Sequence, residues 1–386
     1  MPIVGRDGQW VTDQRFRLQI QLLKILDAWL GRALTLMLLS PRLPCPPLSN
    51  ADLSAEARIL LIRPGGIGDA ALLIPAVLAL KKQFSSCRID VLAERRNARV
   101  FDLCPAVERV DCYDRGTTLL QVLRRRYDVV IDTEQWHRLS AVVARLIRSE
   151  MKIGFGTNER RRMFSHAVDY RHDRYEIDSF LDLLAPLGVA PTPPEEPFLT
   201  VPEEAGDEAV RLLQRLEDRP FVALFPGASI AERRWGREKF RELAAALARQ
   251  GRAVVVVGGP EDREAGDFIV EGLAEGLNLA GRTSLAGSAA ILQRAQLLVA
   301  GDSGVLHIAV GLGVPTVSLF GPGIAEKWAP WGPRHRVINK QFDCSPCTRF
   351  GTTPPCPIDG CCIADISVAE VLLAMQALRA EDDRKE

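Results

Sequence analysis

Residues 58–82 read RILLIRPGGIGDAALLIPAVLALKK, and this stretch decides the fold. Ile59–Arg63 is a short run of mostly branched apolar residues, which is typical of a strand buried on both faces of a sheet. Gly65, Gly66 and Gly68 predict a tight turn, and an apolar helix is expected over about 68–82. A strand, a glycine-rich turn and a helix together predict one unit of a parallel sheet that helices cover on both faces.

The same alternation of apolar runs and helical stretches extends along the rest of the chain. The sequence predicts further strands at Arg88–Leu92, Val129–Asp132, Phe221–Phe225, Ala253–Val257, Gln296–Ala300 and Thr316–Phe320. Helices are expected over about 237–250, 285–295 and 303–312. This pattern belongs to the α/β class and predicts two doubly wound, Rossmann-like halves that face a cleft. Ligands of such sheets bind beyond the carboxyl ends of the strands.

A proline-rich segment separates the two halves. Residues 186–202 contain six prolines, a density that is typical of a linker. The chain has 386 residues, which is the length of roughly two domains. We therefore expect an N-terminal amphipathic helix and linker (1–55), a first Rossmann-like domain (56–190), the proline-rich linker (191–202), a second Rossmann-like domain (203–366), and a C-terminal helix and tail (367–386).

Composition and charge exclude several classes of protein. The chain is 47% hydrophobic and 25% charged, which excludes collagen-like and wholly disordered proteins. Lys+Arg and Asp+Glu are 49 each, so the net charge is zero and no nucleic acid partner is expected. The first apolar stretch contains Lys24, Asp27 and Arg32, which argues against a secretory signal, and no uncharged run is long enough to span a membrane. We therefore expect a cytoplasmic protein.

Residues 16–39 form an amphipathic pattern ahead of the first domain. Apolar residues recur at helical spacing, at Leu22, Ile25, Leu26, Trp29, Leu30, Ala33, Leu34 and Met37. The opposite side carries Arg17, Gln21, Lys24, Arg32 and Thr35. Two interpretations stay open. Either the helix packs on the body of the protein, or it lies on an anionic membrane surface as a peripheral contact.

The glycine-rich turn of the first half carries a carboxylate. Asp69 lies at the start of the expected helix, where it is either a helix cap or a general base that faces a cleft. A Rossmann-type oxidoreductase that uses a nicotinamide cofactor is an alternative, because Glu94 follows the next strand. The spacing G-x-G-x-x-G of such enzymes is absent, since the glycines stand at 65, 66 and 68.

Three motifs of the second half offer groups suited to phosphates or sugars. Residues 225–229 (FPGAS) lead to two arginines, which donate well to phosphate oxygens. Residues 257–262 (VGGPED) end on acids that accept hydrogen bonds from sugar hydroxyls or cap a helix. Residues 301–304 (GDSG) open a helix whose N–H groups form an anion site, and His307 follows one turn later. Each motif alone also fits solvated arginines, a helix cap or a structural histidine.

Together, these motifs resemble glycosyltransferase family 9, the heptosyltransferase family of lipopolysaccharide core assembly. The resemblance covers about residues 57–375. It rests on the strand–GGIGD–helix unit with Pro75, Leu80 and Lys81, and on the runs PGAS…RRW, VVVVGGPED, NLAGRTSL and GDSGVLHIAVGLGVPTVSLFGP. It implies the GT-B fold, with the acceptor on the N-terminal half and the nucleotide sugar on the C-terminal half.

The resemblance also implies a reaction, in which heptose passes with inversion from ADP-L-glycero-D-manno-heptose to the lipopolysaccharide inner core. Asp69 matches the catalytic base that takes the proton of the acceptor hydroxyl. The positions that match the donor site are Ser229, Arg233, Asp262, Asp302, Ser303, Gly304 and His307. Many members carry lysine at the position of Arg233, and arginine holds a phosphate as a planar fork rather than as a point charge.

An anionic core acceptor needs cationic groups on the first half. The residues expected to bind the acceptor are Gly66, Gly68, Arg95, Arg96 and Arg138. Further basic runs stand at Arg124–Arg126 and Arg160–Arg162. Each run fits the carboxylates or phosphates of the acceptor, or an ordinary solvated surface.

Five of the nine cysteines lie near the C-terminus, at Cys344, Cys347, Cys356, Cys361 and Cys362. The spacing allows structural zinc, but packed reduced thiols are favoured, and disulfides are a third alternative. Because side chains and helix dipoles can carry the phosphate charge, no catalytic metal and no cofactor besides the nucleotide sugar are expected. A catalytically silent, membrane-associated assembly partner that acts through residues 16–39 is a further alternative. The expected location is cytoplasmic, with peripheral contact to the cytoplasmic face of the inner membrane.

Overall fold

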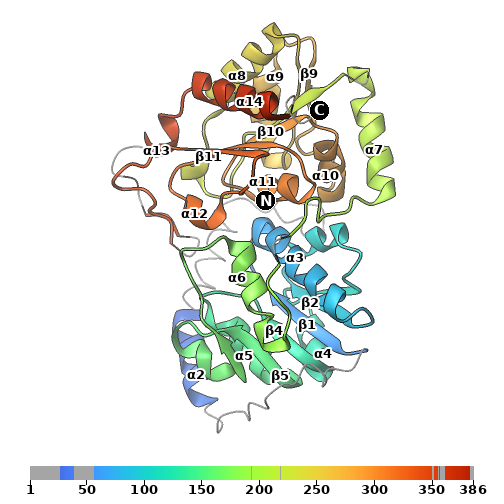
Figure 1. Cartoon of the computed structure of the whole chain (residues 1–386), viewed down its shortest axis with the longest axis vertical. Helices are drawn as coiled ribbons and strands as arrows, with labels where there is room; N and C mark the ends of the chain where they lie inside the picture. Colours follow the sequence, from blue (N-terminus) through green and yellow to red (C-terminus); the bar gives the residue numbers. More distant parts are fainter. Residues whose placement is uncertain are drawn as a thin grey trace. The chain divides into compact units, whose positions relative to one another are not determined.

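The computed structural model describes residues 27–38, 56–192, 194–217, 219–349, 352–354, 356 and 361–382. The chain divides between Pro194 and Glu195 into two compact units, which are described separately (Figure 1). This division falls within the proline-rich segment. The expected helix before Asp27 and the linker over 39–55 lie outside the described residues.

The N-terminal unit is built on a parallel sheet in the order β3-β2-β1-β4-β5-β6. Its strands are β1 (Arg58–Arg63), β2 (Arg88–Ala93), β3 (Arg109–Cys112), β4 (Arg126–Asp132), β5 (Arg148–Phe155) and β6 (His166–Val168). The register places Ile59 beside Ile89 on one side and beside Val129 on the other. The strand order reverses between β1 and β4, and ligands of doubly wound sheets bind at this switch point.

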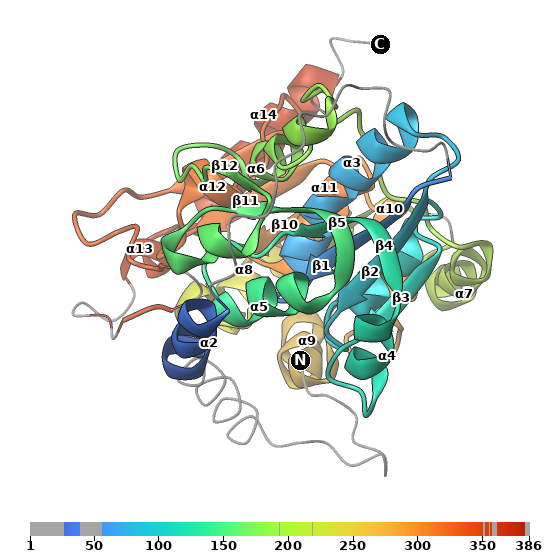
Figure 2. The same cartoon turned by 90° about the horizontal axis from the view of Figure 1, so that it is seen from below.

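Helices cover both faces of this sheet. They are η1 (Asp27–Gly31), α2 (Arg32–Met37), α3 (Ile67–Gln83), η2 (Ala98–Leu103), α4 (Thr118–Arg124), α5 (Arg138–Leu146), η3 (Asn158–Met163), α6 (Glu176–Asp182) and η4 (Ala185–Leu187). The helix α3 is mostly apolar and is buried continuously from Ala70 to Val77, which fits a helix that packs directly on the strands. The helix α2 lies beside α5 at the periphery of the unit (Figure 2).

The C-terminal unit repeats the architecture, with a parallel sheet in the order β12-β11-β10-β7-β8-β9. Its strands are β7 (Phe221–Phe225), β8 (Ala253–Val256), β9 (Gly276–Asn278), β10 (Leu297–Gly301), β11 (Thr316–Phe320) and β12 (His335–Asn339). Here the switch point lies between β7 and β10, which pair in parallel. These two sheets confirm the predicted α/β class and the two doubly wound halves.

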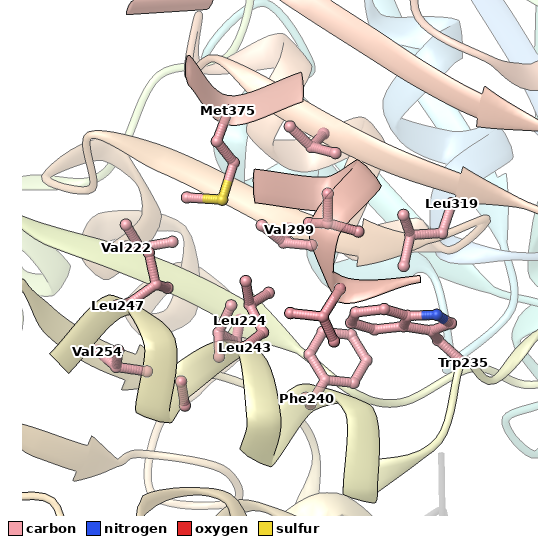
Figure 3. Close-up of a cluster of buried hydrophobic side chains, with 14 of the residues drawn as sticks. Val222, Leu224, Trp235, Phe240, Leu243, Leu247, Val254, Val299, Leu319 and Met375 are labelled. Carbon is pink, nitrogen blue, oxygen red and sulfur yellow. The ribbon is translucent and has the colours of Figure 1, made fainter. Parts of the chain in front are cut away.

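The core of the C-terminal unit forms where helices meet the sheet. The helices are α7 (Glu203–Leu213), η5 (Gln214–Leu216), η6 (Ala231–Arg233), α8 (Arg237–Arg249), η7 (Pro260–Asp262), α9 (Arg263–Val270), α10 (Leu285–Gln293), α11 (Gly304–Gly311), α12 (Ala325–Trp328), α13 (Cys361–Ala364) and α14 (Val368–Asp382). Phe240, Leu243 and Leu247 recur at helical spacing on α8 and pack on Val222 and Val254 (Figure 3). Met375 of α14 joins the same cluster.

None of the helices in the described part of the chain combines the length and the apolar character needed to cross a bilayer.

Candidate functional site

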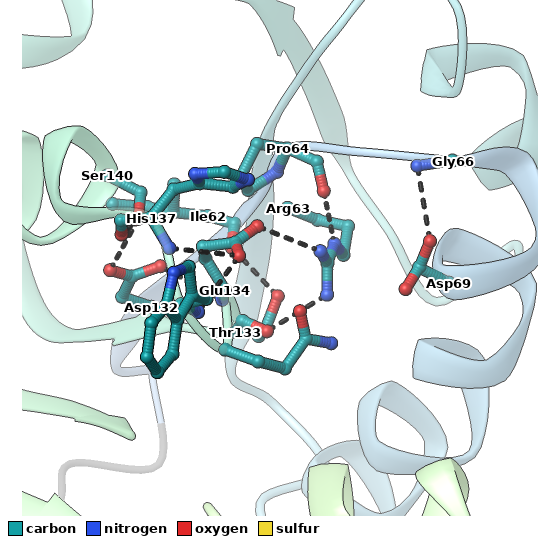
Figure 4. A network of polar contacts seen from close by, with 12 residues as sticks. Ile62, Arg63, Pro64, Gly66, Asp69, Asp132, Thr133, Glu134, His137 and Ser140 are labelled. Atoms are coloured by element: carbon teal, nitrogen blue, oxygen red, sulfur yellow. Dashed lines mark hydrogen bonds and ion pairs between the residues drawn. The ribbon is translucent and has the colours of Figure 1, made fainter. Parts of the chain in front are cut away.

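The turn after β1 brings Asp69 to the carboxyl edge of the N-terminal sheet. Gly65 has φ +110°, a backbone conformation that residues with a Cβ rarely adopt. The Gly66 N–H then donates to Asp69 Oδ2 at 3.2 Å (Figure 4). Asp69 therefore caps the start of α3 in this structure, and its partly exposed carboxylate stands at the switch point. The cap and the general base are compatible roles, because one carboxylate has several acceptor sites.

A buried arginine supports this turn. Arg63 donates to the carbonyl oxygens of Pro64 at 2.6 Å and Thr133 at 2.9 Å, and its Nη2 lies 3.4 Å from Glu134 Oε2 (Figure 4). Burial disfavours the ionised form of Glu134, but the charges of Arg63, His137 and Arg160 outweigh it and lower the pKa of Glu134. The contact ties the end of β1 to the end of β4 across the switch point.

A second buried ion pair joins the end of β4 to η3. Arg160 Nη2 is 2.8 Å from Asp132 Oδ2, and both side chains are fully buried. Burial raises the pKa of Asp132, although Arg160 and the hydroxyl of Ser140 oppose this. The interpretation of Arg160–Arg162 as a solvated or acceptor-facing run is therefore wrong for Arg160. Arg160 instead forms a buried ion pair that joins η3 to Asp132 of β4. Two opposite charges that are removed from water stabilise each other only at short range.

The arginines expected to bind the acceptor already have carboxylate partners. Arg95 Nε lies 3.1 Å from Asp114 Oδ2, and Arg96 pairs with Glu94. Arg138 Nη2 lies 2.7 Å from Glu159 Oε2. Arg95 and Arg96 follow β2, and Arg138 opens α5 after β4, so these residues share the carboxyl edge with Asp69.

The N-terminal segment contributes to this edge through Asp27. Leu139 N–H donates to Asp27 Oδ1 at 2.8 Å, across 112 positions of sequence. The N-cap residue of α5, His137, makes no side-chain cap of its own, so Asp27 supplies the missing acceptor. Burial opposes the charge of Asp27, but the hydrogen bonds from His137 and from the Leu139 and Arg138 amides outweigh it and lower its pKa.

We expect Asp27→Ala to destabilise the start of α5 by about 0.5–2 kcal/mol, because the amide of Leu139 loses its acceptor. Since folding lowers the pKa of Asp27, its contribution is complete above the ordinary carboxyl pKa and is lost as the pH falls through the lowered value. Hydrogen exchange at the Leu139 amide measures the cap directly. Asp207→Asn, at an exposed position of α7, is the control and should leave that amide unchanged.

In the C-terminal unit, an arginine and an acid again face each other across the switch point. Arg233 follows β7, Asp302 follows β10, and Arg233 Nη1 lies 2.8 Å from Asp302 Oδ2. A Cβ at Gly323 would lie 2.2 Å from the same carboxylate oxygen, so only glycine leaves room for it. Among the residues that the structure describes, Arg233 Nε is buried without a hydrogen-bond partner. A buried donor of this kind is costly unless a ligand accepts from it.

His307 lies beside this pair on the first turns of α11. It is buried, and its Nδ1 has no hydrogen-bond partner within the described residues. Burial, with the nearby charge of Arg233, lowers the pKa of His307 to about 3, so the imidazole is neutral. The ring of Trp328 lies 6.5 Å away, between centroids. His307 therefore offers a neutral polar atom to a ligand, and not a second positive charge.

The other predicted donor residues lie on the loops of the same edge. Ser303 is the N-cap of α11, with its Oγ 3.4 Å from the Leu306 amide, and Gly304 begins the helix. Ser229 is exposed on the loop after β7. The structure thus brings Arg233, Asp302 and His307 into one cluster.

Asp262 is buried at the end of η7, where its Oδ2 accepts from Gly259 N–H at 2.9 Å. Burial, together with the negative charge of Glu261, raises the pKa of Asp262 to about 6. A Cβ at Gly227 would lie 2.3 Å from Asp262 Oδ1, so the carboxylate packs directly against the loop after β7. The carboxylate both caps a turn and borders the predicted donor loop.

The cysteine cluster keeps its open alternatives. The described thiols Cys87, Cys104, Cys112, Cys344, Cys347, Cys356 and Cys362 form no disulfide with one another. Across the described ranges, no three His, Cys, Asp or Glu side chains are placed to hold a metal ion. Cys45 and the side chain of Cys361 lie outside the described part.

Comparison with known proteins decides the family. The model of "Glycosyltransferase family 9 (heptosyltransferase)" matches residues 117–356, which is more than half of the 386 residues. The chain belongs to this family. This family 9 glycosyltransferase is 27% identical to lipopolysaccharide heptosyltransferase 3 of Escherichia coli over 289 residues, covering 68% of this chain and 83% of that protein.

Two further comparisons agree with this. Lipooligosaccharide heptosyltransferase 2 of Haemophilus influenzae is 26% identical, covering 72% of this chain and 88% of that protein. The structure of E. coli ADP-heptose lps heptosyltransferase II aligns with a TM-score of 0.69 at 23% identity, covering 84% of this chain and 99% of that one. The fold of the transferase is therefore the GT-B fold that the sequence predicted. The comparisons favour a glycosyltransferase over the oxidoreductase and the silent assembly partner.

Two features of the transferase escaped the sequence reasoning. Glu134 and Gly323 were not singled out, although one neutralises Arg63 and the other makes room for Asp302. A glutamate two residues after the strand run VVID was the available signal for Glu134, because a charge there must find a partner at the sheet edge. Gly323 directly follows the family run that ends at Pro322. Its role depends on its contact with Asp302, which the sequence does not reveal.

Proposed function

We propose that this transferase moves heptose from ADP-heptose to an anionic lipopolysaccharide core acceptor, with inversion at the anomeric carbon. The names of its relatives supply the sugar and the pathway. The observation that carries the proposal is the cluster of Arg233, Asp302 and His307, where two buried nitrogen atoms lack a partner among the described residues. A diphosphate offers the acceptor oxygens that Arg233 needs, at the amino end of α11.

In the proposed reaction, each unit supplies one part of the chemistry. Asp69 takes the proton of the acceptor hydroxyl as that oxygen attacks the anomeric carbon. A new glycosidic bond forms on one face of the sugar while the bond to the diphosphate breaks on the other, and the electron pair leaves with ADP. Arg233, the amino end of α11 and the neutral His307 stabilise the leaving diphosphate, with Ser229, Ser303 and Gly304 as further donor contacts. Metal is not required for this charge balance.

The acceptor must displace existing ion pairs. Arg95, Arg96 and Arg138 are each paired with a carboxylate of the same unit. A core phosphate or carboxylate can take the place of Asp114, Glu94 or Glu159, because those partners are themselves near the surface. The Gly66 and Gly68 turn then holds the acceptor next to Asp69. Without the acceptor, each arginine therefore stays paired with its carboxylate.

Asp262 gives donor binding a pH dependence. We propose that its ionised carboxylate accepts from nucleoside hydroxyls, so affinity falls as the pH drops below about 6, by about tenfold per pH unit. The measurement is calorimetric titration with ADP-glucose, whose esterified phosphates do not titrate in this range. Asp262→Asn should bind weakly at every pH. An unchanged pH profile in that variant would contradict the assignment.

The activity itself is tested with the purified full chain. ADP-heptose, ADP-glucose and UDP-glucose are each incubated with a set of truncated, phosphorylated and unphosphorylated core oligosaccharides, and products are measured by mass spectrometry. We expect a mass increase of one heptose only with ADP-heptose and an anionic acceptor. Transfer from UDP-glucose alone would overturn the proposed donor, and no transfer to any core acceptor would overturn the proposed substrate class.

We also propose that the transferase works at the cytoplasmic face of the inner membrane, where a lipid-anchored core acceptor would be presented. Peripheral contact, rather than a spanning segment, is the form of association expected from residues 16–39. Packed reduced thiols remain the favoured state of the cysteine cluster, and metal analysis of the purified protein can test the alternative of structural zinc.

A further inference from the structure

The helical segment 27–37 is docked with its polar side inward. Asp27, Gly31 and Thr35 recur every four residues and are all buried against the N-terminal unit. The outward side carries Trp29 and Met37, whose exposed fractions are 79% and 78%, with Leu30 and Leu36 beside them. A surface helix of a globular protein normally turns its apolar side inward, so this segment has the reverse orientation.

Specific contacts fix this orientation. Asp27 accepts from the Leu139 amide at 2.8 Å, and its Oδ2 lies 3.6 Å from His137 Nδ1. Arg32 Nε lies 3.4 Å from Glu159 Oε1. A rotation that buried Trp29 would break the cap on α5 and expose the amide that Asp27 satisfies. The apolar side therefore faces outward because the contacts of Asp27 and Arg32 hold the polar side against the unit.

The outward side is exceptional on this molecule. Twelve large hydrophobic side chains are exposed among the described residues, and four of them lie between Trp29 and Met37. Scattered exposed apolar residues need no explanation, but a concentration on one short helix marks a surface that meets an apolar phase. Leu146 of the neighbouring α5 is also exposed.

The elements around this helix are positively charged, although the chain as a whole is neutral. Segments 27–37, 138–146 and 158–163 contact one another and hold six arginines against two acids, and two further acids, Asp132 and Asp169, pair with Arg160 and Arg161. Of the two acids within the segments, Asp27 is buried and Glu159 is paired with Arg138. Arg32 and Arg161 are well exposed. An apolar strip with a cationic rim is complementary to an anionic lipid surface.

We propose that the outward face of residues 27–37 is the membrane-docking surface, with Trp29 and Met37 entering the headgroup boundary of an anionic bilayer. Arg32, Arg161 and Arg162 then meet the lipid phosphates. A convex helix with a tryptophan and a basic rim fits a lipid surface better than a protein groove, which would need a matching cavity in the partner. The inference extends the peripheral contact proposed above, and does not depend on which sugar is transferred.

The test uses the full chain and vesicles of phosphatidylethanolamine with phosphatidylglycerol, against vesicles of phosphatidylcholine. Wild type should sediment with the anionic vesicles, and more weakly at high salt. The double variant Trp29→Ser/Met37→Ser should lose binding at least tenfold. The matched control is Trp331→Ser/Leu373→Ser, since those side chains are exposed to 68% and 64% on the C-terminal unit. It should bind as wild type.

The proposal is overturned if the wild type does not sediment with anionic vesicles or if Trp29→Ser/Met37→Ser binds them like the wild type. It is also overturned if Trp331→Ser/Leu373→Ser loses as much vesicle binding as Trp29→Ser/Met37→Ser. If instead the outward residues mediate self-association, sedimentation velocity will show an oligomer that disappears in Trp29→Ser/Met37→Ser, and the face is then a protein interface. Transfer to a lipid-free core oligosaccharide is measured in parallel. This transfer reaction needs no membrane, so its absence would argue against the proposed activity and not against the docking surface.

Discussion

Asp69→Asn will reduce the turnover number by about 10²–10⁴-fold while leaving donor affinity unchanged. The amide cannot take the proton of the acceptor hydroxyl, so the attacking oxygen must lose it to water. The fold should survive, because the side-chain oxygen of asparagine can still accept from the Gly66 N–H that Asp69 now holds at 3.2 Å. Turnover is measured by mass spectrometry, and donor binding by calorimetry with ADP.

A matched control separates loss of the base from loss of a helix cap. Glu370 has the same structural role on α14, where it accepts from the Ser367 amide at 2.9 Å. Glu370→Gln removes that charge in the same way, together with the ion pair that Glu370 makes with Lys340 after β12, and should keep full turnover because no role in the chemistry is assigned to Glu370. If Asp69→Asn turned over like wild type, the carboxylate would be a cap alone.

Arg233→Met is expected to lower kcat by about 10²–10³-fold and to weaken ADP binding. The variant removes the buried Nε donor and the positive charge beside the proposed diphosphate. Arg233→Lys should recover part of the affinity, since it restores the charge without the planar fork. Steady-state kinetics and ADP titration measure both effects.

The single variant leaves Asp302 buried without its cation, which can lower stability by itself. The double variant Arg233→Met/Asp302→Asn removes that charge and should recover stability, yet its ADP affinity should stay low. Arg237→Met is the control, because Arg237 lies at the surface, where it pairs with Glu238 and Glu264 and covers the ring of Phe268. Full ADP affinity in the double variant would mean that Arg233 has a structural role only.

Every interior strand except β5 was predictable from the sequence, and the edge strands were not. The bounds predicted for β7 and β11 agree with the structure, because both are five-residue runs in which every residue is buried. All four edge strands escaped prediction: β3, β6, β9 and β12. An edge strand has one neighbour and less burial, so its sequence lacks the continuous apolar signal. The interior strand β5 was also missed, since it opens on the polar run RSE.

The site was predictable in its positions but not in its partners. Glycines and acids after strands mark a carboxyl edge, which is why Asp69 and Asp302 stood out. The pairing of Arg63 with Glu134 spans 71 positions and depends on which strands become neighbours. The N-terminal helix shows the same limit, because its apolar pattern indicated a buried or lipid-facing side but could not reveal that Asp27 would be the docked residue.

The cap between Asp27 and Leu139 has a consequence for how the chain is made. The carboxylate leaves the ribosome more than a hundred residues before the amide that it will bind, because 112 positions separate them. The segment that is synthesised early can therefore dock only after β4 and the start of α5 exist. Contacts between such distant positions form late in folding. Until then the contacts that the described residues of this helix make with α5 and η3 are missing, and a nascent chain shorter than about 140 residues lacks the cap.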